Sequence, residues 1–117
     1  MKDYKFEFDL DGEKYTLVFN LNVMEAIQEE YGSVEKWGKL TDNKGGKEPN
    51  AKAIIFGFKE MINEAIDMEN EEKGTDKNFL SLKQVGRIIT RAGLKESANK
   101  LNEAVIESIK DDHPKNI

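Results

Sequence analysis

The sequence begins with two apolar segments that alternate with polar residues and are separated by an Asp-Gly dipeptide. Apolar side chains occupy every second position in residues 4–10 and again in residues 15–19. Asp11-Gly12 is typical of a type I′ turn, whose two central residues need positive φ. The pattern predicts a β-hairpin with one apolar face. Because two strands alone are marginally stable in water, the rest of the chain must cover that face.

The residues after the hairpin have helical periodicity. Asn22, with Glu25 as its capping-box partner, is predicted to start a helix that runs to Tyr31 and ends at Gly32. Ser33 is predicted to cap a short second helix. Its single apolar face comprises Val34, Trp37 and Leu40, and Trp37 lies either in the core or in a subunit contact.

The longest apolar stripe predicts a central helix over residues 51–68. Gly57 within it costs about 1 kcal/mol relative to Ala, which favours close packing against another part of the chain. Ser81 and Gln84 form a capping box for the next helix, and Gly93 closes it. A last helix is predicted from Leu94 to about Lys110.

These elements predict a single domain over residues 1–117 of the α+β class, mainly α. An N-terminal β-hairpin packs on a bundle of about four to five helices. Two polar, glycine-containing stretches, 41–50 and 69–78, are predicted to be flexible loops. Residues 111–117 are predicted to fray.

Composition narrows the class of protein. The chain has no cysteine, which excludes disulfides and thiolate chemistry, and its net charge of -5 argues against nucleic acid as a general partner. No apolar run reaches the roughly 20 residues that span a bilayer, and the first residues lack the apolar stretch of a signal peptide. We expect a cytoplasmic protein with protein partners and no membrane association.

No stretch of the sequence has the spacing of a catalytic, cofactor or metal site. The only histidine, His113, lies in the predicted tail. The carboxylate pairs 29–30 and 71–72 lie on polar stretches, where adjacent helical residues point in different directions. The DLDGEK turn lacks the ligand spacing of an EF-hand, and Gly45-Gly46 lacks the context of a phosphate loop. We therefore expect a protein that is not an enzyme and needs no cofactor.

A basic helix pair over residues 81–100 resembles a DNA-binding helix-turn-helix. Two positions depart from that motif, because Ile89 stands where a small residue is usual and Asn99 where an aliphatic one is usual. The alternative is a solvated surface that balances acidic helices elsewhere. The basic residues are Lys83, Arg87, Arg91, Lys95 and Lys100.

A second resemblance covers most of the chain. The hairpin FEFDLDGEKYTLVF leads directly into NLNVMEAIQEEYGSVEKW, and a variable loop precedes AKAIIFGFKEMI. This order is similar to that of the phage tail assembly chaperones. Asn22, Ile27, Glu29 and Gly32 match the family's first helix, and SLKQVGRIITRAGL is similar to its closing segment. The polar stretch 69–78 is longer than the family pattern.

The resemblance implies a non-catalytic assembly factor in the cytoplasm of an infected or lysogenic bacterium. It would bind the tape measure protein and present it to tail tube subunits. A groove for amphipathic helices is expected at partly exposed apolar residues, although these residues could equally form the core or a homo-oligomer contact. The candidate residues are Trp37, Leu40, Phe56 and Phe58. The alternatives are a DNA-binding regulator of a mobile element that uses residues 81–100, and a structural head-tail connector of the virion.

Overall fold

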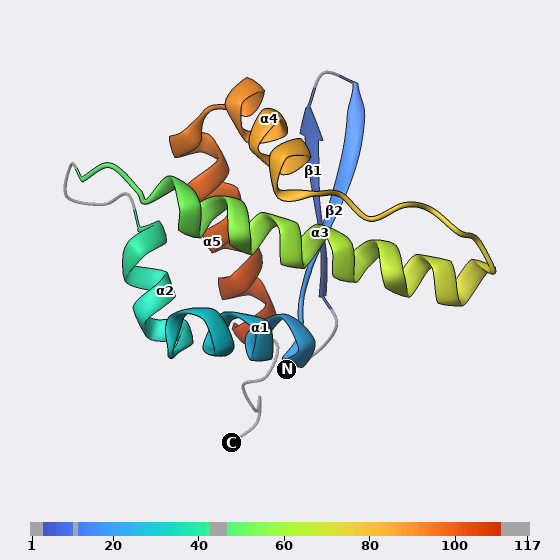
Figure 1. Ribbon diagram of the computed structural model, residues 1–117, viewed down its shortest axis with the longest axis horizontal. Helices are drawn as coiled ribbons and strands as arrows, with labels where there is room; N and C mark the ends of the chain where they lie inside the picture. Colours follow the sequence, from blue (N-terminus) through green and yellow to red (C-terminus); the bar gives the residue numbers. More distant parts are fainter. Residues whose placement is uncertain (1–3, 11, 43–46, 111–117) are drawn as a thin grey trace.

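The structure, a computed structural model, describes residues 4–10, 12–42 and 47–110. The predicted tail 111–117 with His113, the turn residue Asp11 and the pair Gly45-Gly46 lie outside the described residues. A two-stranded sheet precedes the helices, which confirms the predicted α+β, mainly α fold (Figure 1). The elements are β1 (Tyr4–Leu10), β2 (Glu13–Phe19), α1 (Leu21–Tyr31), α2 (Val34–Thr41), α3 (Ala51–Lys73), α4 (Leu82–Ala92) and α5 (Leu94–Lys110).

The predicted hairpin is confirmed, although β2 begins earlier than the predicted Tyr15. The strands are antiparallel with Phe8 opposite Tyr15, and Gly12 has the positive φ of 82° that the turn requires. Leu17 and Phe19 on the apolar face are buried. Val18 points to the opposite face and is buried as well. The end of the second strand, residues 17–19, is therefore covered on both sides, whereas its first residues are exposed, and of the helices α3 makes the most contacts with the strand.

The first helix begins at a different asparagine from the predicted one. Asn20 is the N-cap: its backbone is extended, and its side chain accepts a hydrogen bond from the Val23 amide at 3.2 Å. Asn22, the predicted cap, lies in the first turn, and its side-chain amide donates to Glu64 at 3.0 Å. The prediction was wrong because β2 ends at Phe19, so the chain turns into the helix directly after the strand.

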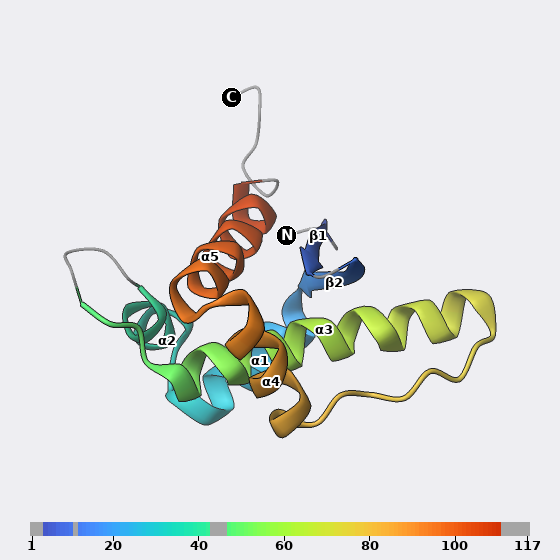
Figure 2. The ribbon, with the colours of Figure 1, turned by 90° about the horizontal axis from the view of Figure 1, so that it is seen from above.

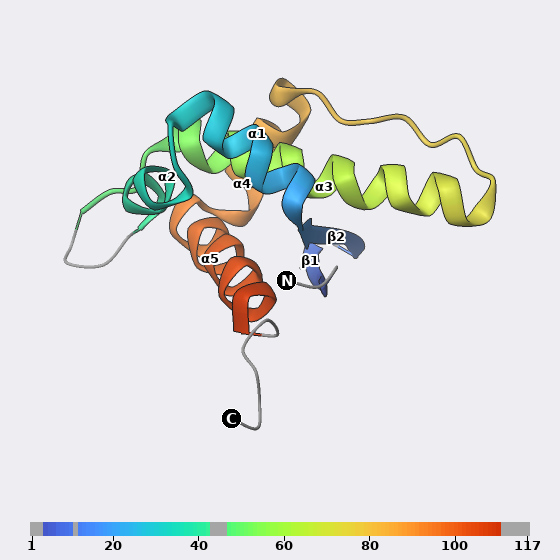
Figure 3. The ribbon, with the colours of Figure 1, turned by 90° about the horizontal axis from the view of Figure 1, so that it is seen from below.

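The central helix α3 is longer than predicted. It begins after the N-cap Asn50 and continues past Met68 to Lys73, where Gly74 adopts the left-handed conformation. The Lys73 ammonium lies 3.3 Å from the Glu69 carboxylate one turn earlier, a pairing that supports the added turn. The helix end projects beyond the hairpin, and the chain returns beside it to α4 (Figure 3). The non-helical part of the predicted loop 69–78 is thus confined to its second half.

The remaining helix boundaries agree with the sequence predictions. Ser33 caps α2, and its hydroxyl accepts from the Lys36 amide at 3.0 Å. The capping box of Ser81 and Gln84 is present at the start of α4, and Gly93 separates that helix from α5. Within the described part of the chain, no helix is both long and apolar enough to cross a membrane.

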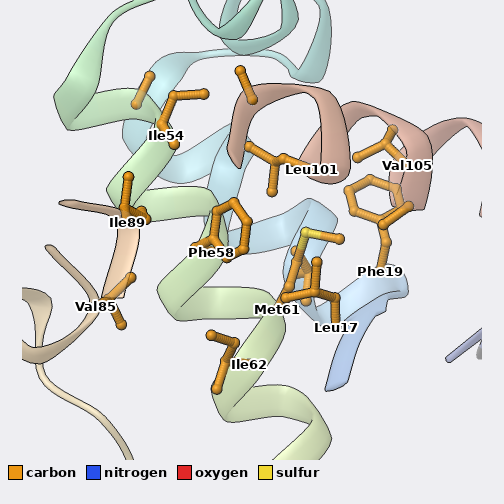
Figure 4. Close-up of a cluster of buried hydrophobic side chains, with 14 of the residues drawn as sticks. Leu17, Phe19, Ile54, Phe58, Met61, Ile62, Val85, Ile89, Leu101 and Val105 are labelled. Atoms are coloured by element: carbon orange, nitrogen blue, oxygen red, sulfur yellow. The ribbon is translucent and has the colours of Figure 1, made fainter. Parts of the chain in front are cut away.

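The core lies between one side of α3 and the strands and helices that pack against that side. Phe58 packs its ring edge-on to Phe8 of the hairpin, with centroids 5.6 Å apart. Figure 4 shows Phe58 and Met61 of α3 facing the other helices and the sheet. The buried side chains labelled there are Leu17, Phe19, Ile54, Phe58, Met61, Ile62, Val85, Ile89, Leu101 and Val105.

Two groups of elements lie on opposite sides of α3. In Figure 1, α3 crosses the molecule with α4 above it and α1 below it. Figure 2, a view from above, shows α5 and the hairpin on one side of α3 and α4 on the other, while α1 starts next to the hairpin, crosses α3 and ends on the side of α4. The side of α3 that faces away from α5 is therefore flanked by two helices.

Candidate functional site

The structure separates the four apolar residues that were predicted to form a binding groove. Trp37 is 1% exposed and Phe58 is 0% exposed, so for these two the expectation of partial exposure is wrong and the alternative that they form the core holds. Trp37 can be buried because Gly57 has no side chain, so the indole lies against the backbone of α3. Leu40 is 39% exposed on α2, and Phe56 is half-buried on the outer side of α3.

The outer side of α3 forms the floor of a groove whose walls are α1 and the residues from 79 to the end of α4. Helical spacing puts Lys52, Phe56, Lys59, Asn63 and Asp67 on this side. Two adjacent hollows lie along it. We call the whole surface the α3 groove.

The larger hollow, called the basic hollow below, has a volume of about 820 Å³. Its apolar part comprises Ile55 and Phe56 of α3 with Leu82 of α4, and Leu82 is 52% exposed. Gly86 has no side chain to occupy the space next to Ile55, so the apolar part of the hollow stays open there. Four cations and one carboxylate surround it: Lys52, Lys59, Lys83, Arg87 and Glu30.

The smaller hollow, called the acidic hollow below, has a volume of about 160 Å³. Its apolar contribution is Val23 of α1 and the exposed ring of Phe79. Its charged lining residues are all carboxylates: Glu60, Glu64 and Asp67. Lys59 of the basic hollow and Glu60 of the acidic hollow form an ion pair at 3.2 Å.

Hydrogen bonds hold the walls of the groove in place. The side chain of Asn63 accepts from the Leu80 amide at 2.8 Å and donates to the Leu80 carbonyl at 3.0 Å. This pair fixes the returning chain, and hence Phe79 and Leu82, against α3. On the other wall, the amides of Asn20 and Asn22 both donate to the Glu64 carboxylate. The groove is therefore built into the packing of the fold.

Tyr31 supports the aromatic side chain in the basic hollow. Its ring packs edge-on to that of Phe56, with centroids 5.5 Å apart. Burial raises the pKa of the Tyr31 hydroxyl, and the nearby Glu30 carboxylate raises it further. Among the described residues, this buried hydroxyl has no hydrogen-bond partner. The neutral tyrosine is thus the form that this packing favours.

The basic residues predicted to form a DNA-binding surface are divided among several environments. Lys83 and Arg87 border the basic hollow, whereas Arg91 lies with Tyr15 in another hollow that Arg87 also lines. Burial raises the pKa of Tyr15; its hydrogen bond to Glu13 acts in the same direction, and Arg91 opposes both. Lys100 lies 6.0 Å from the centre of the Phe6 ring and 4.0 Å from Glu103.

The described residues contain no cluster of three or more carboxylate or histidine side chains that could hold a metal ion. Glu29 and Glu30 are exposed on α1, and Glu71 and Glu72 are exposed near the end of α3. Glu69 has its pKa lowered by hydrogen bonds from Lys77 and Lys73, which is a surface ion-pair network at the end of α3. Residues 4–10, 12–42 and 47–110 thus present a groove and surface ion pairs.

Comparisons of the chain with protein-family models, with curated proteins and with solved structures found no match. The candidate site is therefore defined by its geometry and chemistry. It is a surface with half-buried and exposed apolar side chains between charged borders.

Proposed function

We propose that the protein is a non-catalytic phage or prophage tail assembly chaperone. It binds helical segments of a tape measure protein in the bacterial cytoplasm and delivers them to tail tube subunits. The observation that carries the proposal is the α3 groove, whose exposed Leu82 and half-buried Phe56 offer apolar area between charged borders. The sequence resemblance in the hairpin and first helix supports the same role.

A groove of this kind suits a long helical client. Helix-in-groove recognition uses apolar residues of the client at i, i+3, i+4 and i+7, which insert between two helices of the binding protein. Polar borders keep the empty groove compatible with water and set the direction of approach. No covalent chemistry is needed, because the chaperone only has to cover apolar faces of the client until assembly.

The test is co-purification with the long coiled-coil protein encoded near this chain. Leu82→Asp places a charge in the groove at an exposed position, so the fold should be retained. Ile106→Asp is the matched control, because Ile106 is 57% exposed on α5, on the other side of α3. We expect the unchanged protein and Ile106→Asp to capture the client, and Leu82→Asp to bind at least about tenfold more weakly.

The outcomes separate the possibilities. Loss of binding only in Ile106→Asp would keep the chaperone role and move the site to α5. Failure of the unchanged protein to capture the client would contradict the chaperone role. Detection of the chain in purified phage particles would instead favour a structural virion connector.

A DNA-binding regulator remains the second candidate, because Lys83, Arg87 and Arg91 are all exposed on α4. Such binding would rest on phosphate contacts and would weaken steeply with salt. Retardation of duplex DNA at low but not at high ionic strength, lost in Arg87→Ala, would favour this function over the chaperone.

A further inference from the structure

The α3 groove has opposite charge at its two ends. The basic hollow, beside the first two turns of α3, contains four cations and one carboxylate. The acidic hollow, beside residues 60–67 of the same helix, contains three carboxylates. The two hollows share α3 as their floor, and the residues from Phe79 to Leu82 connect them on one wall. Any elongated ligand that fills the groove therefore meets negative charge at one end and positive charge at the other.

An α-helix is itself polar along its length. Its free amides give the N-terminus about half a positive charge, and its free carbonyls give the C-terminus about half a negative charge. Lys52 and Asp67 are separated by about 22 Å along α3 at the usual rise of a helix, which is the length of about four turns. A client helix of that length would place one terminus in each hollow.

We propose that the α3 groove binds its client helix in one direction, antiparallel to α3. The client N-terminus lies in the acidic hollow, and its C-terminus lies in the basic hollow. The inference rests on the proposed client-binding role and adds the orientation and the charge pattern of the ligand. The preferred segment has an apolar stripe, Lys or Arg in its first turn, and Asp or Glu in its last turn.

This charge pattern differs from that of a helix that is stable alone. Isolated helices are stabilised by acidic residues in the first turn and basic residues in the last turn. A segment with the reverse pattern is a weak helix in water, and its charges are compensated only when it lies in the groove. The groove thus favours client segments that become helical on binding, which suits a chaperone for an unassembled protein.

The absence of cysteine from the sequence permits a direct test by disulfide cross-linking. Asn22→Cys places a thiol at the acidic hollow, where Asn20 keeps the other hydrogen bond to Glu64. Thr90→Cys places one at the basic hollow, and both residues are uncharged and exposed. The probe is a synthetic peptide of about four helical turns with the preferred charge pattern. One version has a single cysteine at its N-terminus and the other has it at its C-terminus.

We expect the N-terminal cysteine to cross-link to Asn22→Cys about tenfold more than to Thr90→Cys, and the C-terminal cysteine to show the opposite preference. A peptide of the same composition without the apolar stripe should cross-link to neither. In the background of Asp67→Lys with Lys83→Glu, the preference should fall; Glu103→Lys with Lys110→Glu on α5 is the control for the same charge changes.

Equal cross-linking at both ends, or the reverse preference, would overturn the proposed orientation. Absence of cross-linking with either peptide would overturn the groove as a helix-binding site. Capture of the full-length client together with either result would leave the chaperone role in place, so the two proposals fail separately.

Discussion

The contact between Gly57 and Trp37 makes a sharp prediction about stability. A Cβ atom at position 57 would lie 2.5 Å from Cζ2 and 3.2 Å from Cε2 of the Trp37 indole. It would also lie 3.3 Å from Cδ2 of Leu101. The indole has little freedom to move, because it is fully enclosed and its Nε1 donates to the Ala53 carbonyl at 3.0 Å. Gly57→Ala therefore forces a shift between α2 and α3.

Two opposing effects set the change in the free energy of unfolding of Gly57→Ala. Carbon atoms prefer separations of about 3.5–4.0 Å, so the new contact belongs at the upper end of the 1–3 kcal/mol that overpacking usually costs. Replacing Gly by Ala inside a helix returns about 1 kcal/mol through helix propensity. We expect Gly57→Ala to lower the free energy of unfolding by about 2 kcal/mol, which corresponds to roughly 10 °C in Tm for a domain of this size.

Gly38→Ala is the matched control, because Gly38 also lies within a helix and a Cβ there has no neighbour within 4 Å. This variant should be more stable than the unchanged protein by about 0.5–1 kcal/mol. Urea unfolding followed by far-UV circular dichroism measures both variants. Combining Gly57→Ala with Trp37→Phe should cost less than the sum of the two changes, since the smaller ring relieves the contact. A Gly57→Ala protein as stable as Gly38→Ala would refute the proposed packing.

Three further predictions concern residues around the groove and the end of α3. Asn63→Ala removes both hydrogen bonds to Leu80 and should lower the free energy of unfolding by about 1–3 kcal/mol, with faster amide exchange at Leu80; unchanged exchange would contradict this. Tyr31→Phe removes a buried hydroxyl that has no partner among the described residues, so urea unfolding should show equal or higher stability. A loss of more than about 1 kcal/mol in the free energy of unfolding would contradict this prediction. Because the pKa of Glu69 is lowered from 4.5 in the folded protein, its ion pairs stabilise the fold above that pH and are lost as the pH falls through the lowered value. NMR titration of the Glu69 carboxyl should show this lowered pKa, and Lys77→Gln should raise it.

Local signals made much of the fold predictable from the sequence. Ser33 and Ser81 cap helices because each supplies a side-chain oxygen to an amide three residues later, an interaction that depends only on neighbouring residues. The Asp-Gly turn and the strand alternation are equally local. Asn20 and Asn22 are chemically identical, so the choice between them depended on where β2 ends.

The candidate site was less predictable, because it depends on which side of α3 faces the core. Ile54, Ile55, Phe56 and Phe58 are all apolar, and the sequence alone does not separate the pair that lines the groove from the pair that is buried. Gly57 was the useful signal, since it indicated close packing, but it did not identify Trp37 as its neighbour. The contribution of Leu82 follows from tertiary structure, because Asn63 fixes the returning chain beside α3.

The most direct test of the groove as the client-binding site is to map the client on the folded protein by NMR. Backbone amide shifts of the labelled protein would be followed as the client tape measure segment is added. We expect the changes to concentrate in α1, in α3 from Lys52 to Asp67, and in the residues from Phe79 to Thr90. Changes centred instead on α5 and the hairpin, with those residues unaffected, would contradict the proposed site.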